Sequence, residues 1–125
     1  MANQGAIKKM TATARFVQAT DAASGTGAKT IADTMNIPIG SVVTACITKG
    51  EVSSNSSGNS ETCTVTVGGV SVSAALAQAV MAAGNVNTDT TGAVTTSAVN
   101  IGMTVGGEAF TAGTLDIILE YYLID

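Results

Sequence analysis

The sequence predicts an all-β protein, folded as an antiparallel jelly-roll-like sandwich of about eight short strands with one short helix. Of its 125 residues, 46% are hydrophobic but only 3% are aromatic, so a core of small and β-branched side chains is expected. Apolar and polar residues alternate over short stretches, and Gly, Asn and Ser separate these stretches at regular spacing. This pattern is typical of sandwiches and barrels.

The final stretch, residues 113–124, is the most hydrophobic run and carries both tyrosines. With the two-residue period of a strand, one face is wholly apolar and the other is mixed. The apolar face consists of Leu115, Ile117, Leu119, Tyr121 and Leu123. We therefore expect a half-buried strand in the centre of a sheet, paired with distant parts of the chain.

The elements before it follow from the same alternation. Residues 1–10 are small, polar and basic without alternation, which predicts a flexible basic N-terminal arm ahead of a single domain over residues 11–125. The alternating stretches predict further strands at residues 11–19, 29–35, 41–52, 61–67, 93–94 and 99–105. An Ala-rich stretch, residues 73–83, ends at Gly84 and predicts the helix, and residues 84–92 are expected to form a polar loop.

The strands at residues 41–52 and 61–67 flank a short polar loop at 53–60, which predicts a hairpin. Aligning their apolar faces sets Ile47 opposite Cys63, so Cys46 should point to the other face of the sheet unless a β-bulge shifts the register. No apolar segment follows the basic N-terminus, so we expect no signal peptide and synthesis in the cytoplasm. Two buried, reduced thiols are expected there rather than a disulfide.

No pattern in the sequence predicts a catalytic, cofactor-binding or metal-binding site. The chain has no histidine, which removes the usual general base and zinc ligand at neutral pH. Residues 25–30 superficially resemble a phosphate-binding loop, but Ala28 stands where the glycine before Lys29 is needed.

One polar segment leaves two interpretations open. Asn85, Asn87 and Asp89 have the alternate spacing of a calcium loop, but no bidentate glutamate follows them. The segment is therefore either a solvated surface loop, which the composition favours, or a calcium site.

The charges are unevenly distributed along the chain. All five basic residues lie within the first 49 positions, whereas seven of the nine acidic residues follow them. The net charge of −4 with few aromatics argues against a nucleic-acid partner, and no apolar run reaches the length of a membrane span. The asymmetry is either accidental, or it indicates that the basic N-terminal residues Lys8, Lys9 and Arg15 bind an acidic partner surface, such as a neighbouring copy.

Three motifs occur in order along the chain from about residue 28. An extended segment, Ala28-Lys29-Thr30-Ile31-Ala32, is followed by the turn and strand Ile37-Pro38-Ile39-Gly40-Ser41-Val42-Val43, and Thr111-Ala112-Gly113-Thr114-Leu115-Asp116-Ile117 runs into Glu120-Tyr121 near the end. This order resembles the small jelly-roll decoration (cement) proteins on the heads of tailed bacteriophages and related head-fibre domains. The helical stretch at residues 73–83 and the low aromatic content depart from that pattern.

The resemblance implies a non-enzymatic structural virion protein that lies on the capsid surface after synthesis in the host cytoplasm. Its expected partners are the major capsid protein, whose neighbouring subunits it would clamp, and itself, as a homotrimer. No cofactor is expected, because a docking protein needs no reactive group.

Two other classes of function stay open. A head- or tail-fibre module would bind receptor glycans through the Ser-, Asn- and Thr-rich loops at residues 53–60 and 84–92, and would bind sugar as an isolated protein. A small carbohydrate-active enzyme would need a compact acidic pair. Asp116 and Glu120 share a strand face but lie about 13 Å apart along it.

Overall fold

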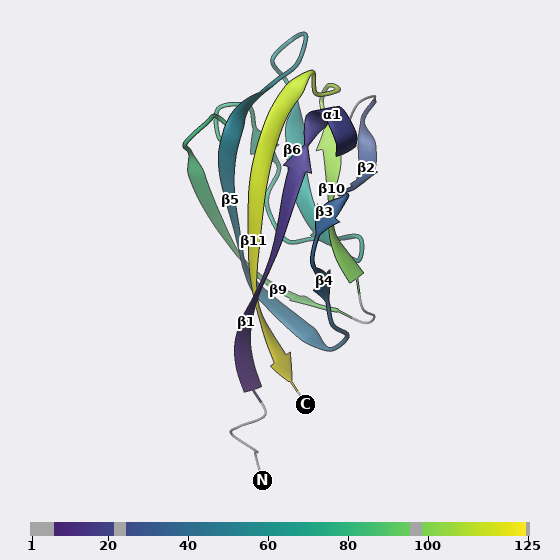
Figure 1. Ribbon diagram of the computed structural model, residues 1–125, viewed down its shortest axis with the longest axis vertical. Coiled ribbons are helices and arrows are strands. Elements are labelled where there is room, and N and C mark those ends of the chain that lie inside the picture. Colours follow the sequence, from purple (N-terminus) through teal and green to yellow (C-terminus); the bar gives the residue numbers. More distant parts are fainter. Residues whose placement is uncertain (1–6, 22–24, 96–98, 125) are drawn as a thin grey trace.

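The computed structural model describes residues 7–21, 25–95 and 99–124, which form two antiparallel sheets packed as a sandwich (Figure 1). The five-stranded sheet has the order β3-β1-β11-β5-β9. Its strands are β1 (Ile7–Val17), β3 (Asp33–Thr34), β5 (Ser41–Asn55), β9 (Val86–Val94) and β11 (Ala112–Ile124). The predicted all-β, jelly-roll-like fold is confirmed.

The six-stranded sheet has the order β2-β10-β6-β7, with β4 paired to β10 and β8 paired to β6. Its strands are β2 (Gly27–Thr30), β4 (Asn36–Ile37), β6 (Thr62–Val67), β7 (Val70–Ser71), β8 (Leu76–Ala77) and β10 (Val99–Gly106). One helical turn, α1 (Gln18–Asp21), follows β1. No helix in the described ranges is long and apolar enough to cross a membrane.

Strand β11 lies in the middle of its sheet, as the sequence predicts. It pairs with β1 from Ile7↔Ile124 to Val17↔Thr114 without a register shift, and with β5 on its other side. Its apolar face is buried at Leu115, Ile117, Leu119 and Tyr121, none of them more than 4% exposed. Figure 1 shows this yellow strand running between β1 and β5 along the long axis of the molecule.

The core fills the space between the sheets with alternate residues of both. Phe16 of β1 packs edge-on against Phe110, with ring centroids 5.4 Å apart. The six-stranded sheet contributes Cys63, Val65, Val67, Ile101, Met103 and Val105, all buried. The aromatic residues therefore serve the core more than the surface, which is consistent with their small number.

The predicted helix at residues 73–83 is wrong. Its place is taken by β8, in which Leu76 pairs with Cys63, and by a tight turn in which Met81 N–H donates to Ala77 O and Gln78 O. An isolated helix of this length is marginal in water, and Ala side chains give it little apolar surface to bury. Pairing with β6 instead buries Leu76, and Met81 inserts into the core.

The predicted hairpin is also wrong, because β5 and β6 belong to different sheets. The registers of both β5 ladders shift at Thr44, a β-bulge that reverses the alternation so that Val43 and Cys46 both point into the core. Cys46 and Cys63 are consequently both buried in one core cluster, rather than on opposite faces of a sheet. Both thiols are free, as expected.

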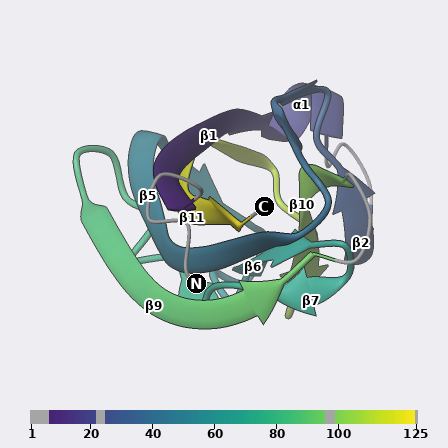
Figure 2. The same cartoon turned by 90° about the horizontal axis from the view of Figure 1, so that it is seen from below.

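Two predicted boundaries also differ. Residues 86–92 of the expected polar loop belong to the edge strand β9, in which successive residues alternate between exposed and half-buried positions. Strand β1 begins at Ile7, so Lys8, Lys9 and Met10 belong to a strand and not to an arm, and residues 1–6 lie outside the described ranges. Figure 2 shows β9 curving around the sandwich beside β5.

Candidate functional site

The outer face of the five-stranded sheet gathers charged side chains from β1, β3, β5 and β11. On β1, Ala12, Ala14 and Phe16 point into the core, so the alternate positions Lys9 and Arg15 point outward. The same rule turns Asp116 and Glu120 of β11 outward, because Leu115, Ile117 and Leu119 are buried. Basic residues from the start of the chain thereby meet acidic residues from its end.

One row of alternating charge crosses four strands of this face. The ladder registers place Arg15 beside Asp33 of β3 on one side and Asp116 of β11 on the other, and Asp116 beside Lys49 of β5. Arg15 holds Asp116 with both ends of its fork: Nε donates to Oδ1 at 2.6 Å and Nη2 to Oδ2 at 3.0 Å. Such bidentate pairs are the most directional of ion pairs.

Two more ion pairs lie on the same sheet. Lys9 Nζ is 3.4 Å from Glu120 Oε1, and Lys49 Nζ is 3.3 Å from Glu51 Oε1. These pairs are solvent-exposed, so each contributes little to folding on its own. Together they leave a face on which charges of both signs are ordered and accessible.

The Arg15–Asp116 pair shifts the pKa of both groups. The hydrogen bond from the guanidinium holds the pKa of Asp116 below its ordinary value of 3.8. The same hydrogen bond raises the pKa of Arg15. Both charges are therefore retained throughout the neutral range.

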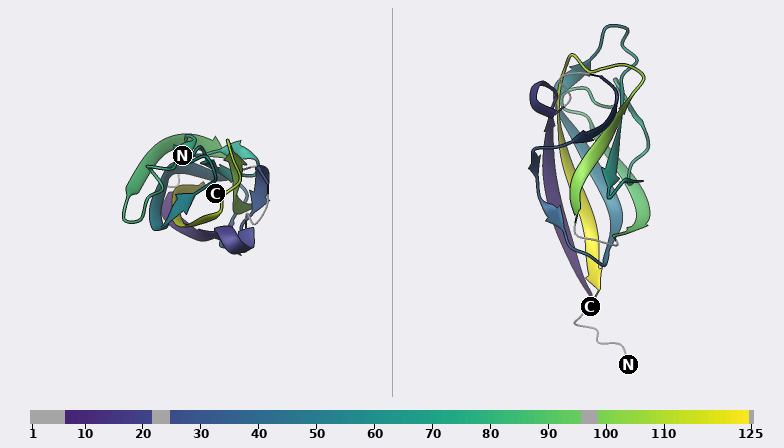
Figure 3. Two further views of the ribbon diagram at one scale, coloured as in Figure 1. Left: turned by 90° about the horizontal axis from the view of Figure 1, so that it is seen from above. Right: turned by 90° about the vertical axis from the view of Figure 1, so that its right-hand side faces the viewer.

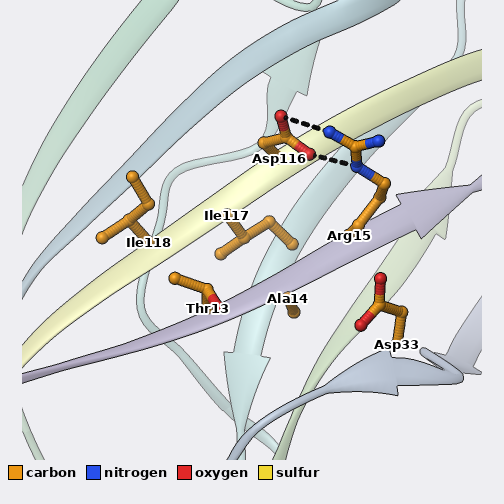
Figure 4. Close-up of a pocket in the computed structure, with 7 residues that line it drawn as sticks. All are labelled: Thr13, Ala14, Arg15, Asp33, Asp116, Ile117 and Ile118. Atoms are coloured by element: carbon orange, nitrogen blue, oxygen red, sulfur yellow. Dashed lines mark hydrogen bonds and ion pairs between the residues drawn. The ribbon is translucent and has the colours of Figure 1, made fainter.

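A hollow of about 400 Å³ adjoins this pair (Figure 4). Figure 4 shows Asp33 across β1 from Asp116, with Arg15 between the two carboxylates. The lining consists of Thr13, Ala14, Arg15, Asp33, Asp116, Ile117 and Ile118. In this hollow, the carboxylates of Asp33 and Asp116 flank the Arg15 guanidinium (Figure 4).

The three residues predicted to bind a partner all lie on β1, but their surroundings differ. Arg15 and Lys9 have acidic partners within the chain, Asp116 and Glu120. Lys8 is exposed and forms no ion pair with any described residue. Of the three, Lys8 is the most available to another molecule, and the partner-binding role of all three stays a prediction.

Sequence reasoning missed Asp116 as the ion-pair partner of Arg15, and Asp33 as its neighbour in the β1–β3 ladder. The available signal was the charge asymmetry itself: basic residues in the first strand and acidic residues at alternate positions in the last. The structure satisfies part of that asymmetry within the chain, by pairing β1 with β11.

The two loop motifs do not form ligand sites. Residues 27–30 form β2, and Asn85 lies at the turn before β9, where its side chain donates to Ala79 O. Asp89 Oδ2 accepts hydrogen bonds from Asn87 Nδ2 and from Ala74 N–H. Within the described ranges, no group of three or more His, Cys, Asp or Glu side chains is placed to hold a metal ion.

Comparison with known proteins finds likeness in structure alone. No protein-family profile and no curated protein sequence matches the chain. A chain of the structure described as the cyanophage Pam1 capsid asymmetric unit superposes with a TM-score of 0.65 at 19% identity, covering 98% of this chain and 90% of that one. A chain of the acid-stable capsid structure of Helicobacter pylori bacteriophage KHP30 gives a TM-score of 0.58 at 12% identity, covering 94% and 93%. At these identities, the two comparisons establish a shared fold.

Proposed function

We propose that this chain is a non-enzymatic structural protein of a tailed-phage virion, a decoration or cement protein that binds the outside of the capsid and clamps neighbouring major capsid subunits. The observation that supports this most is the full-length likeness to two phage capsid chains, each covered over nine-tenths or more of its length. Separately from that comparison, the sequence motifs resemble the decoration proteins of tailed-phage heads.

The free edge of β1 is the proposed docking element. In the described part of the chain, β3 pairs with β1 only at Ala14 and Arg15, and Met35 N–H donates to Thr13 O. The backbone of residues 7–12 thus has a partner strand, β11, on one side only. An extended segment of a capsid subunit can add to such an edge through main-chain hydrogen bonds. Lys8 and Lys9 favour an acidic segment there.

The glycan-binding alternative has weaker support in the structure. In the Ser-rich loop after β5, Gly58 N–H, Ser60 N–H and Ser60 Oγ all donate to Glu108, so these donors are already used within the chain. Most of the second candidate loop belongs to the strand β9. Neither segment contains an aromatic side chain on which a sugar could stack, so we favour the docking function.

The test is cosedimentation with capsids assembled from the major capsid protein of the same virus. A Lys8→Glu/Lys9→Glu double variant reverses charge on the β1 edge, and Lys49→Glu reverses an exposed charge on β5 of the same sheet. We expect the double variant to lose capsid binding in about 0.15 M salt, where surface charges act over about 8 Å, and Lys49→Glu to retain it. Equal binding by all three proteins would rule out β1 as the docking element, and no binding by any of them would rule out the capsid function.

The proposed homotrimer is a separate question with its own measurement. Light scattering of the free protein and of a version lacking residues 1–6 gives the mass of each assembly. Removal of residues 1–10 would be a poorer test, because it would delete four residues of β1 and weaken the fold itself. A trimer in solution, or one formed only on capsids, agrees with the proposal; a monomer in both settings contradicts it.

A further inference from the structure

The loop between β5 and β6 lies at the end of the sandwich opposite the end of β11 (Figures 1 and 3). Its backbone and side chains contact the carboxylate of Glu108. Glu108, just after β10, accepts hydrogen bonds from Gly58 N–H at 2.8 Å, from Ser60 N–H at 3.1 Å and from Ser60 Oγ at 2.5 Å. A side chain at position 58 would overlap Glu108, which explains the glycine there. The Ser60 hydroxyl is the main cause of a lowered pKa at Glu108, so this carboxylate is charged at neutral pH.

A second carboxylate lies directly beneath this loop. Glu61 is 1% exposed, and its Oε1 accepts a hydrogen bond from Ser56 Oγ at 2.7 Å. Ser56 Oγ is also 3.3 Å from Glu108 Oε1. A serine hydroxyl has one proton, so it can donate fully to only one of the two carboxylates. Glu61 and Glu108 therefore converge on a single donor.

Some buried side-chain oxygens at this end of the molecule lack hydrogen-bond partners. Two buried side-chain oxygens in the described ranges lack a hydrogen-bond partner, Glu61 Oε2 and Ser54 Oγ, and both belong to this end of the sandwich. Lys9, Arg15 and Lys49 form ion pairs with Glu120, Asp116 and Glu51, not with Glu61 or Glu108. A buried carboxylate oxygen without a partner is costly, and an ordered water or an ion nearby would account for it.

We propose that Glu61, Glu108 and Ser56 form a binding site for a hard divalent cation, with calcium the best match. All three offer oxygen atoms, the ligand type that calcium prefers, and calcium tolerates irregular coordination completed by water. The cation would pair with Glu61 Oε2, neutralise two adjacent carboxylates and tie the loop between β5 and β6 to the start of the β10–β11 connection. The site lies at the opposite end of the sheet from the Lys8 and Lys9 edge and does not depend on the proposed capsid function.

The site differs from the calcium loop that the sequence suggested. At the Asn85–Asp89 segment, Asp89 Oδ2 is already satisfied by two donors and the backbone is committed to β9. At Glu61, by contrast, a buried oxygen is left without any donor. The two locations can be separated by single isosteric changes.

The experiment is a thermal-unfolding titration with calcium from about 10⁻⁵ to 10⁻² M, a range that includes weak calcium sites. The protein is first freed of metal with a chelator, and ionic strength is held constant with potassium chloride. The variants are Glu61→Gln and Glu108→Gln, with Asp89→Asn as the control at the rival segment. Isothermal calorimetry on the same four proteins measures binding directly.

We expect Tm to rise with calcium in the wild type and in Asp89→Asn, because a ligand that binds only the folded state stabilises it. That rise should be lost in Glu61→Gln and in Glu108→Gln. The proposal is overturned if the wild type shows neither a rise in Tm nor heat of binding, if Glu61→Gln keeps the wild-type response, or if Asp89→Asn loses it. Should Glu61→Gln fail to fold, Glu108→Gln and the calorimetric titration of the wild type decide.

Discussion

Arg15 shows how one residue joins the two ends of this chain. Its guanidinium makes two hydrogen bonds to Asp116, 101 positions later, and lies in a ladder pair with Asp33. The exposed setting keeps the energetic contribution small, but the geometry is specific. Arg15 therefore acts mainly in shaping the charge pattern of the sheet's outer face.

The first prediction at this scale concerns the titration of Asp116. Arg15→Met removes the main cause of the lowered pKa, so the pKa of Asp116 should return toward its ordinary value of 3.8. Lys49→Met removes only a weaker charge interaction and should change it less. NMR titration of the Asp116 carboxyl carbon measures both, and an unchanged pKa in Arg15→Met would contradict the assigned pairing.

The sign of the associated pH dependence follows from the lowered pKa. Asp116 is more acidic in the folded chain than in the unfolded chain, so its contribution to stability is complete above pH 3.8 and is lost as pH falls through the lower folded value. Denaturation of the wild type and of Arg15→Met should therefore converge at strongly acidic pH and differ slightly near neutrality. A difference that grows on acidification would be inconsistent with this linkage.

At the scale of single elements, β11 has one face buried in the core between the sheets and one face toward solvent. Leu119 is fully buried at the centre of the strand, whereas its neighbour Ile118 is 37% exposed on the outer face. The two positions share backbone conformation and pairing partners, β1 and β5, and differ chiefly in the face that they occupy.

This contrast gives a matched pair of substitutions. Leu119→Ala should lower the free energy of unfolding by about 2–5 kcal/mol, because it leaves a cavity in the core. Ile118→Ala removes a similar volume from the surface and should cost under about 1 kcal/mol. Denaturant unfolding at neutral pH measures both. Equal losses would mean that the assignment of faces along β11 is wrong.

A strand or helix could be predicted from the sequence where its local residue pattern favours the same structure as its pairing with distant strands. β11 was predictable because its alternation is long and unbroken, and the same alternation buries Leu115, Ile117 and Leu119. The stretch at residues 73–83 was not, because an Ala-rich segment suits a helix locally, while the decisive pairing with Cys63 is remote. The ion pair between Arg15 and Asp116 could not be predicted for the same reason, because Asp116 lies on a strand remote in sequence.

The position of Cys46 could not be predicted from the alternation of apolar and polar residues. One additional residue, Thr44, reverses the alternation of β5 and turns Cys46 into the core. No local feature of the sequence marks Thr44 as a bulge, because the register of both neighbouring strands determines it. Once the bulge is known, the placement of both thiols follows.

At the scale of the whole molecule, the two thiols report on the packing of the sheets against each other. Cys46 comes from one sheet and Cys63 from the other, and burial raises the pKa of each to about 12. The reactive thiolate is therefore scarce, and reagents have no access to it while the sandwich is closed.

We expect neither thiol to react with an aromatic disulfide reagent at about pH 8, where a free cysteine is substantially reactive, until the protein unfolds. In denaturant, both should react. The labelling rate in native buffer then measures how often the sheets separate. Immediate labelling of either cysteine in the native protein would contradict the packing described for the core.

The pairing of β1 with β11 also governs when the molecule can fold. The central strand of the five-stranded sheet, β11, comes after all the other strands in the sequence, and its longest uninterrupted ladder is with the first strand, β1. Contacts this remote in sequence make folding slow, because a large loop must close before they form. During synthesis, β1 lacks its main pairing partner until β11 has emerged from the ribosome. A chain that stops short of β11 therefore has no central strand around which the five-stranded sheet can assemble.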